Sequence, residues 1–299
     1  MPSRLLLFCA LLTASASSVA MTLYRTTDAY GVVSYSEHDS EGAKAYVIFR
    51  EPIVERLDGQ VRLYSEVITG GMRFSAHNEL FAPVEVELRL QGLSNAQGGN
   101  APRIVRKVLP ARSTQLLSVV MAQPGKQLGY QSKLDYALGS PLQRPQAFRY
   151  PFPWRGGPFR LSQGPNGRYS HFGAKGRYAM DIAMPEGTPI VAARGGVVIK
   201  TENSQNGRGT NASGNFVRIL HSDGTMGVYL HLMQGSVVVG EGQRVSVGDA
   251  LAKSGNTGNS SGPHLHFVVQ RNVGLALESI PYQFDRPLGG LPNFTAGNP

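Results

Sequence analysis

Short runs in which apolar and polar residues alternate recur along this chain, and they predict β-strands. In "PVEVELRL", residues 83–90, the two kinds of side chain alternate over eight positions, which is the period of a half-buried strand. Further strand-like runs lie at 61–68, 103–110 and 113–123, separated by turns that contain Gly, Asn or Pro. We therefore expect a small, immunoglobulin-like β-sandwich over residues 55–148. His77, in the turn-like "SAHNEL", is interpreted as a solvent-exposed structural residue.

The second half of the chain carries the same kind of pattern and predicts another β-domain over residues 161–284. Its strand-like runs include "TPIVAARGGVVIK", "NFVRILHS", "GVYLHLM" and "HLHFVVQ", divided by Gly-rich turns. Between the two domains, the prolines and glycines of "YPFPWRGGPF" break regular structure and indicate a linker at 149–160. Trp154 in this linker is expected to pack between domains rather than to line a groove. After residue 284, the tail 285–299 has no apolar periodicity.

Composition supports a fold class that is mostly β. The 299 residues include 36 Gly and 19 Pro, and only 16% are charged, which is typical of a turn-rich chain rather than a helical one. The formal net charge of +9 favours binding to anionic surfaces such as an acidic cell-wall polymer. We expect no nucleic-acid partner, because the sequence holds neither a run of five or more Lys/Arg nor a nucleic-acid-binding module.

The N-terminus predicts export. Residues 1–20 combine Arg4, a short apolar stretch and the small residues Ser18 and Ala20, which is the pattern of a secretory signal peptide. The apolar stretch is too short for a membrane span, so no integral membrane segment is expected. Cys9, the only cysteine, would leave with this peptide, so no thiol can act as a zinc ligand. We expect a periplasmic or extracellular protein.

Residues 21–50 form a separate small module in this interpretation. The stretch "TLYRTTDAYGVVSYSEHDS" predicts two short strands around an "AYG" turn. It resembles a short module found near the N-terminus of many proteobacterial envelope proteins. The matching residues are Tyr24, Asp28, Gly31, Val32, Val33, Tyr35 and Ser36.

Four polar residues in apolar strands carry the candidate chemistry. His264 and His266 lie two apart in "PHLHF", so a strand would present both imidazoles on one face and turn Leu265 into the core. Asp181 lies in the apolar "YAMDIAMP", where a carboxylate needs a salt bridge or a metal ion. His231 in "VYLHLM" is a further histidine in an apolar strand. His221, at a strand end, is interpreted as structural.

These residues stand in segments that resemble the lysostaphin-type (LytM-like) zinc metallopeptidase domain, whose members cut peptide cross-links in bacterial cell walls. The matching segments are "MDIAMPEGTPIVAARGGVV", "VRILHSDGTMGVYLHL", "GDALAKSGNTGNSSGPHLHF" and "SIPYQF". The resemblance implies a β-fold of the duplicated-hybrid-motif, barrel-sandwich type and one Zn²⁺ ion per chain. It places zinc ligands at position 177, Asp181 and His266, and a catalytic pair at His231 and His264. Two histidines and one carboxylate with an open fourth position are typical of catalytic zinc sites.

Position 177, however, is Arg, which cannot bind zinc. One explanation is a degenerate site in a domain that only binds wall or activates another wall hydrolase. The other is that His171 replaces the missing ligand. We favour His171, because the glycines of "HFGAKGRY" suggest a hairpin that would put His171 opposite Arg177 or Tyr178. The expected ligands are then His171, Asp181 and His266.

The sequence thus favours a zinc metalloendopeptidase, a hydrolase acting on peptidoglycan peptides in the cell envelope. A catalytically degenerate wall-binding or activating module is the alternative, and a zinc peptidase with a protein substrate is a third hypothesis. The 55–148 domain is expected either to position the enzyme on the wall or to block its groove as a prodomain.

Overall fold

A computed structural model describes residues 21–27, 33–36, 44–48, 60–98, 103–207 and 211–288 of the chain. Every regular element in these residues is a β-strand, which confirms the predicted fold class, mostly β. Within the same residues, no helix has the length and apolar character needed to cross a membrane. The predicted signal peptide, and all of the predicted tail beyond residue 288, lie outside the described residues.

The N-terminal residues up to Glu51 form a unit of their own. Its backbone holds a three-stranded sheet in the order β2-β1-β3. Strand β1 (Met21–Thr27) pairs antiparallel with both β2 (Val33–Ser36) and β3 (Lys44–Ile48). The first two strands agree with the predicted pair, while β3 was not predicted. The "AYG" turn lies outside the described residues.

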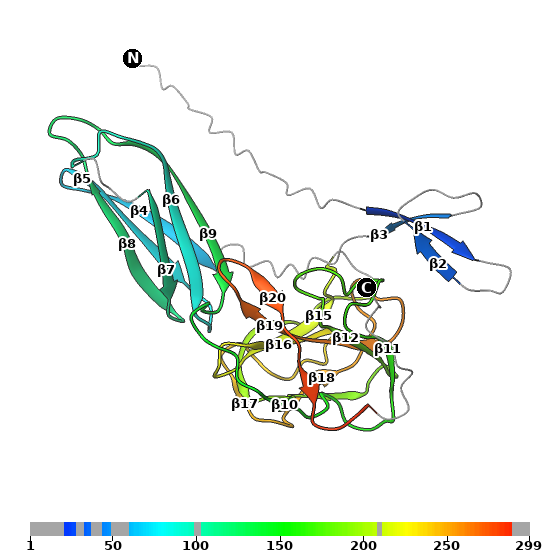
Figure 1. Cartoon of the computed structure of the whole chain (residues 1–299). Helices are drawn as coiled ribbons and strands as arrows, with labels where there is room; N and C mark the ends of the chain where they lie inside the picture. Colours follow the sequence, from blue (N-terminus) through cyan, green and yellow to red (C-terminus); the bar gives the residue numbers. More distant parts are fainter. Residues whose placement is uncertain are drawn as a thin grey trace, which may run out of the picture. The chain divides into compact units, whose positions relative to one another are not determined.

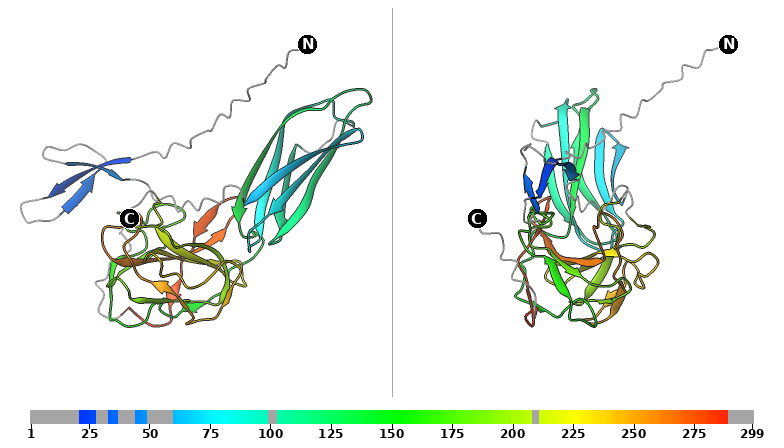
Figure 2. Two further views of the ribbon diagram at one scale, coloured as in Figure 1. Left: turned by 180° about the vertical axis from the view of Figure 1, so that it is seen from behind. Right: turned by 90° about the vertical axis from the view of Figure 1, so that its right-hand side faces the viewer.

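Six antiparallel strands build the predicted sandwich as two three-stranded sheets (Figures 1 and 2). One sheet contains β4 (Val61–Ile68), β5 (Gly71–Asn78) and β8 (Ser113–Met121), and the other contains β6 (Val84–Ser94), β7 (Ile104–Leu109) and β9 (Gly129–Leu138). Phe74 and Val120 from the first sheet pack with Leu88 and Leu90 from the second.

His77 lies within β5 rather than in a turn, and its Nδ1 is 2.8 Å from the hydroxyl of Thr114. Strand β5, with its alternation of buried and more exposed residues, therefore continues through "FSAHN", where the sequence suggested a turn.

The C-terminal half is organised around an eight-stranded sheet in the order β11-β12-β19-β16-β15-β14-β17, with β20 paired to β19. These strands are β11 (Arg160–Gln163), β12 (Met180–Ala183), β14 (Gly196–Glu202), β15 (Asn215–Leu220), β16 (Met226–Leu232), β17 (Arg244–Val245), β19 (His264–Asn272) and β20 (Leu277–Ser279). Two small sheets pair β10 (Arg149–Tyr150) with β21 (Gln283–Phe284) and β13 (Pro189–Val191) with β18 (Ala250–Lys253).

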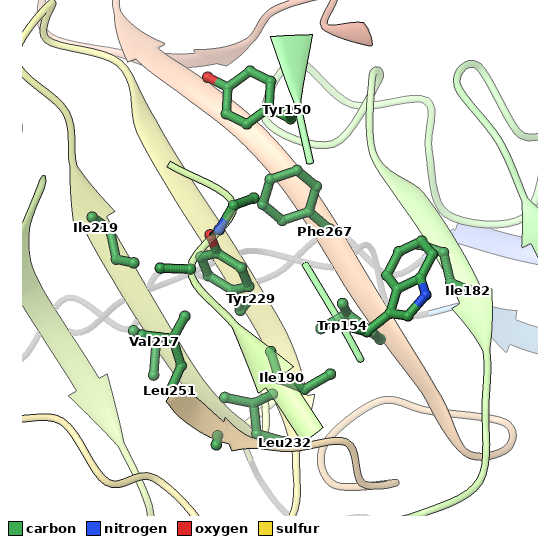
Figure 3. Packing of buried hydrophobic residues seen from close by; sticks show 14 of the residues in the cluster. Tyr150, Trp154, Ile182, Ile190, Val217, Ile219, Tyr229, Leu232, Leu251 and Phe267 are labelled. Carbon is green, nitrogen blue, oxygen red and sulfur yellow. Dashed lines mark hydrogen bonds between the residues drawn. The ribbon is translucent and has the colours of Figure 1, made fainter. Parts of the chain in front are cut away.

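Successive residues of a strand point to opposite sides, so each strand contributes side chains to both faces of this sheet. Both faces bury apolar side chains. On one face, Ile182, Tyr229 and Phe267 belong to the largest apolar cluster (Figure 3). On the other, Val228, Leu230 and Val268 form a smaller cluster. Strands β12, β19 and β16 are consecutive in the sheet, so the residues that they present on this second face lie beside one another.

The predicted linker at 149–160 packs into the larger cluster. Trp154 is buried within the C-terminal cluster rather than between domains, so that expectation is wrong. Its ring stacks on that of Phe152 at a centroid distance of 4.6 Å. Its backbone bridges to Ile190 of β13, and its indole meets the ring of Phe284 edge-on (Figure 3 shows Trp154 beside Ile190). The prolines prevent regular structure, but the aromatic side chains between them are part of the core.

The sandwich strands and the C-terminal sheet also share an apolar cluster. Leu80 and Val84 pack there with Ile199 and Met226. Two hydrogen bonds reach across to the β19–β20 hairpin. The Asn272 side chain donates to the carbonyl of Gly139 over 3.0 Å, and the backbone amide of Leu275 donates to Glu85 Oε2 over 2.6 Å.

Candidate metal centre

Strand pairing places Asp181 directly opposite His266. Strands β12 and β19 are antiparallel, with Asp181 paired to His266 and Ala183 paired to His264. The carboxylate and both imidazoles therefore lie on the same face, while Leu265 points into the larger cluster, as predicted. Nδ1 of His266 lies 2.9 Å from Oδ1 of Asp181. Both residues are buried, and the backbone ladder fixes their separation.

His171 reaches the same carboxylate from a different kind of segment. Its Nε2 lies 3.2 Å from Asp181 Oδ1, and its ring meets that of His266 edge-on with centroids 5.0 Å apart. Its side chain is completely buried. Nδ1 lies 2.9 Å from the carbonyl oxygen of Gly164 and donates a hydrogen bond to it, so the ring proton is on Nδ1 and Nε2 has a lone pair.

The predicted hairpin between His171 and position 177 is wrong. Residues 164–178 form consecutive turns rather than paired strands. The amide of His171 donates to Gly167 O, and the amide of Arg177 donates to Gly173 O, so each bond spans four residues. Glycines and polar residues in this segment form helix-like turns, whose period brings His171 inward. Arg177 precedes β12 instead of lying on it, and its side chain is exposed.

Three donor atoms, one each from His171, Asp181 and His266, lie within 4.8 Å of one another. In the described part of the chain, buried Asp181 Oδ1 has no hydrogen bond of good geometry, although two imidazole nitrogens lie beside it. The buried Nε2 of His266 likewise has no partner there. A buried carboxylate oxygen is costly unless a cation or a donor compensates it. This set of two nitrogens and one oxygen therefore fits a zinc ion in both chemistry and arrangement.

The electrostatics keep Asp181 ionised. Burial on its own raises the pKa of this carboxyl, but the adjacent His171 and His266 outweigh burial and hold the pKa well below its usual range. The carboxylate is thus available as a ligand at neutral pH.

His264 and His231 form a second pair beside these three residues. Their ring centroids are 4.7 Å apart, and His264 Nε2 lies 3.7 Å from Asp181 Oδ1. Nδ1 of His264 is 2.8 Å from Gly262 O, and Nδ1 of His231 is 2.8 Å from Thr257 O. Each Nδ1 therefore carries the proton and donates a hydrogen bond to its carbonyl, which leaves Nε2 as an acceptor. Burial, followed by the neighbouring His231, lowers the pKa of His264 to about 4, so this imidazole is neutral at pH 7.

His231 reaches this face only through a backbone irregularity. Leu230 pairs with His266 and shares its face, so a regular strand would turn His231 to the opposite side. The pairing of β16 with β15 shifts in register here, and His231 has a φ of 61°. A positive φ is uncommon outside glycine, and β-bulges of this kind re-aim side chains. The bulge brings His231 beside His264.

Thr257 holds the bulge in place. Its hydroxyl donates to Leu232 O over 2.7 Å and accepts from the amide of Asn215 over 3.0 Å. Its carbonyl accepts from His231. Gly214, at a φ of 60°, lets the two loops approach, because a Cβ there would lie 2.4 Å from Thr257 O. Sequence reasoning missed Thr257, whose only signal was its place in the polar "GNTGNSSG" turn.

Sequence reasoning also missed Gln163 at the end of β11. Its side-chain amide donates to Asp181 Oδ2 over 3.1 Å. Nothing in "RLSQGPNG" indicates that this glutamine contacts the site.

His221, which was interpreted as a structural residue at a strand end, lies just after β15, where its Nδ1 is 2.9 Å from Gly195 O.

Comparison with known proteins identifies the C-terminal half. The profile described as peptidase family M23 matches residues 175–277. This segment includes Asp181, His231, His264 and His266, whereas His171 lies before it. The family match and the position of His171 are thus separate observations.

Individual relatives also match part of this chain. Peptidoglycan DD-endopeptidase ShyA of Vibrio cholerae serotype O1 is 39% identical over 119 residues, which cover 39% of this chain and 26% of that protein. Peptidoglycan DD-endopeptidase ShyC of the same organism is 41% identical over 93 residues, covering 31% of this chain and 20% of that protein. The chain thus spans about a quarter of these relatives or less.

Among solved structures, a variant of the catalytic domain of the prophage-encoded M23 protein EnpA from Enterococcus faecalis is 26% identical. The alignment covers 44% of this chain and 93% of that domain at a TM-score of 0.35. Because this score is low, the assignment rests on the sequence match.

Proposed function

Since this chain belongs to peptidase family M23 through residues 175–277, we propose that it is a zinc metalloendopeptidase that hydrolyses peptide bonds in bacterial peptidoglycan. The observation that carries the proposal is the convergence of His171, Asp181 and His266, whose donor atoms lie within 4.8 Å. In this proposal His171 takes the ligand place that Arg177 cannot fill.

A bound zinc ion supplies Lewis acidity, which lowers the pKa of water and polarises a carbonyl. The chain itself supplies proton transfer beside that ion. His264 and His231 each present Nε2 as an acceptor, since their Nδ1 protons are held by backbone carbonyls. One of them accepts the proton of the attacking water, and the resulting imidazolium then donates to the departing amine.

The names of the relatives support the substrate class. ShyA and ShyC are both named peptidoglycan DD-endopeptidases, so we propose a D,D-peptide bond of the cell-wall cross-link as the bond cleaved. The net charge of +9 suits binding to an anionic wall polymer. Such a substrate implies action in the cell envelope, either periplasmic or extracellular.

The alternative, a degenerate module that only binds, is less well supported. A degenerate site has no physical reason to gather three imidazoles around one buried carboxylate with a fourth beside them, and a buried unpaired charge is costly to keep. Moreover, both imidazoles of the proposed catalytic pair have their tautomers set by backbone carbonyls.

Digestion of purified peptidoglycan tests the proposal. The full chain should release D,D-cleaved muropeptides, detected by chromatography with mass spectrometry, and chelator should stop the release. Asp181→Asn, which keeps the shape of the side chain and removes its charge, is the matched inactive control. Cleavage of casein without cleavage of peptidoglycan would favour a protein substrate. Absence of bound zinc together with no cleavage of either substrate would favour the binding module.

A further inference from the structure

The turn segment that carries His171 needs a contact that holds it in place. The inference about this contact rests on the proposed function. Asp181 and His266 lie on paired strands, but His171 lies in a segment of turns without a strand or helix of its own. A metal ligand must be held to within a fraction of an ångström for tight binding. Some other contact must therefore tie the turn segment to the strand that carries Asp181.

Gln163 makes that contact with one side chain. It is the last residue of β11 and pairs across the ladder with Asp181. Its Nε2 donates to Asp181 Oδ2 over 3.1 Å and to the hydroxyl of Ser170 over 2.6 Å. Its Oε1 accepts from the backbone amides of Tyr169 and Ser170 over 3.1 and 3.3 Å. Both donors and both lone pairs of the amide are thereby used.

These four bonds connect two of the proposed ligands. Ser170 is the residue directly before His171, so Gln163 fixes the backbone from which that imidazole projects. On the other side, the bond to Oδ2 fixes the rotation of the carboxylate and leaves Oδ1 facing the histidines. A glutamine is suited to this place because it donates to the carboxylate without adding a charge.

Gly167 provides the space that Gln163 occupies. A Cβ at this position would lie 2.4 Å from Cγ and 2.8 Å from Cδ of Gln163. Real Cβ atoms do not approach carbon so closely, so any larger residue would displace the middle of the glutamine side chain. The same glycine accepts a hydrogen bond at its carbonyl from the amide of His171.

We propose that Gln163 is a positioning residue of the metal centre, which sets Asp181 and the His171 segment relative to each other and requires a glycine at position 167. Groups that orient metal ligands typically contribute roughly 10- to 100-fold to metal affinity or activity. Gln163 acts through Asp181 and His171 and does not need to touch substrate.

The experiment measures zinc affinity of the full chain by chelator competition at one fixed pH. Gln163→Ala should weaken zinc binding roughly 10- to 100-fold. Gln163→Met removes the hydrogen bonds but retains the length of the side chain, and it should have a similar effect. Gln115→Met, in the sandwich strand β8, is the matched control and should bind zinc as the wild type does.

A double-substitution cycle tests the link to Gly167. Gly167→Ala alone should weaken zinc binding by displacing Gln163. In the Gln163→Ala background the collision is gone, so Gly167→Ala should cause no further loss. Fully additive losses would overturn the pairing of these two residues.

A spectroscopic measurement separates positioning from general destabilisation. With Co²⁺ in place of zinc, the visible absorption band reports the geometry of the ligands, and it should change in Gln163→Met but not in Gln115→Met. Wild-type affinity and an unchanged band in a folded Gln163→Met protein would overturn the proposal while leaving the proposed function intact. Absence of zinc binding in the wild type would overturn both.

Discussion

Asp181 and His266 are directly opposed residues of two neighbouring antiparallel strands, and their side chains meet at 2.9 Å on the same face of the sheet. Backbone hydrogen bonds on both strands hold this pair, so two of the three proposed ligands are in place before any metal binds. The third, His171, depends on turns and on side-chain contacts. The site thus combines a rigid half with a half whose position must be supported.

Metal removal should lower the stability of the folded chain. The buried Asp181 Oδ1 loses its proposed counter-ion when zinc leaves. A ligand present at a thousandfold excess over its Kd stabilises the native state by roughly 4 kcal/mol. Thermal unfolding followed by circular dichroism should show a lower midpoint with chelator and recovery with added zinc. Asp181→Asn should not respond to chelator. An unchanged midpoint in wild type would argue against a bound metal.

Thr257→Val should reduce activity without releasing zinc. The valine keeps the shape but leaves Leu232 O and the amide of Asn215 without the hydroxyl, so the bulge that aims His231 loosens. A misplacement of about 1 Å can lower a rate roughly 100-fold. We expect kcat on peptidoglycan fragments to fall roughly 10- to 100-fold.

Thr257→Ser retains the hydroxyl and is the control for that substitution. It should keep near-wild-type kcat, and zinc content should be equal in all three proteins. Equal activity of the Val and Ser variants would show that the hydroxyl does not position His231.

The strands were predictable because their signals are local. The strand in "PVEVELRL" and the shared face of His264 and His266 depend only on the two-residue period, and both appear as expected. The strand is not half-buried as predicted, because Glu85 and Glu87 are buried as well. The bulge at His231 could not be predicted, since a regular "VYLHL" strand puts this histidine on the face of Tyr229. Its cause is the long-range contact with Thr257, which no local pattern reveals.

The segment around His171 could not be predicted for the same reason, because long-range contacts determine its conformation. The sequence indicated that this histidine could approach the site, but the hairpin offered as the route is absent. Successive turns bring it inward instead, and they are fastened by Gln163, a residue with no distinguishing motif. Turn segments rich in glycine are compatible with several geometries, so the contact that selects one of them lies outside the segment.

Acid should destabilise the fold through His221. Burial lowers the pKa of this imidazole to about 4 from an ordinary value of 6.5, so the unfolded chain takes up its proton first as pH falls. Stability therefore rises with pH between about 4 and 6.5, by about 3 kcal/mol across that window.

His221→Asn isolates this effect, because asparagine can still donate to Gly195 O but does not titrate. Urea unfolding should be measured for both proteins in chelator, so that metal release does not contribute. The free energy of unfolding of wild type should fall more steeply below pH 6.5 than that of the variant. Parallel curves would contradict the buried, neutral state of His221.

The central claim is that His171 has replaced the ligand missing at Arg177, and zinc content tests it most directly. Inductively coupled plasma mass spectrometry should find one zinc per chain in purified wild type and in Arg177→Ala. His171→Ala, confirmed to be folded by circular dichroism, should retain little zinc. Stoichiometric zinc in His171→Ala, or loss of zinc in Arg177→Ala, would contradict the assignment.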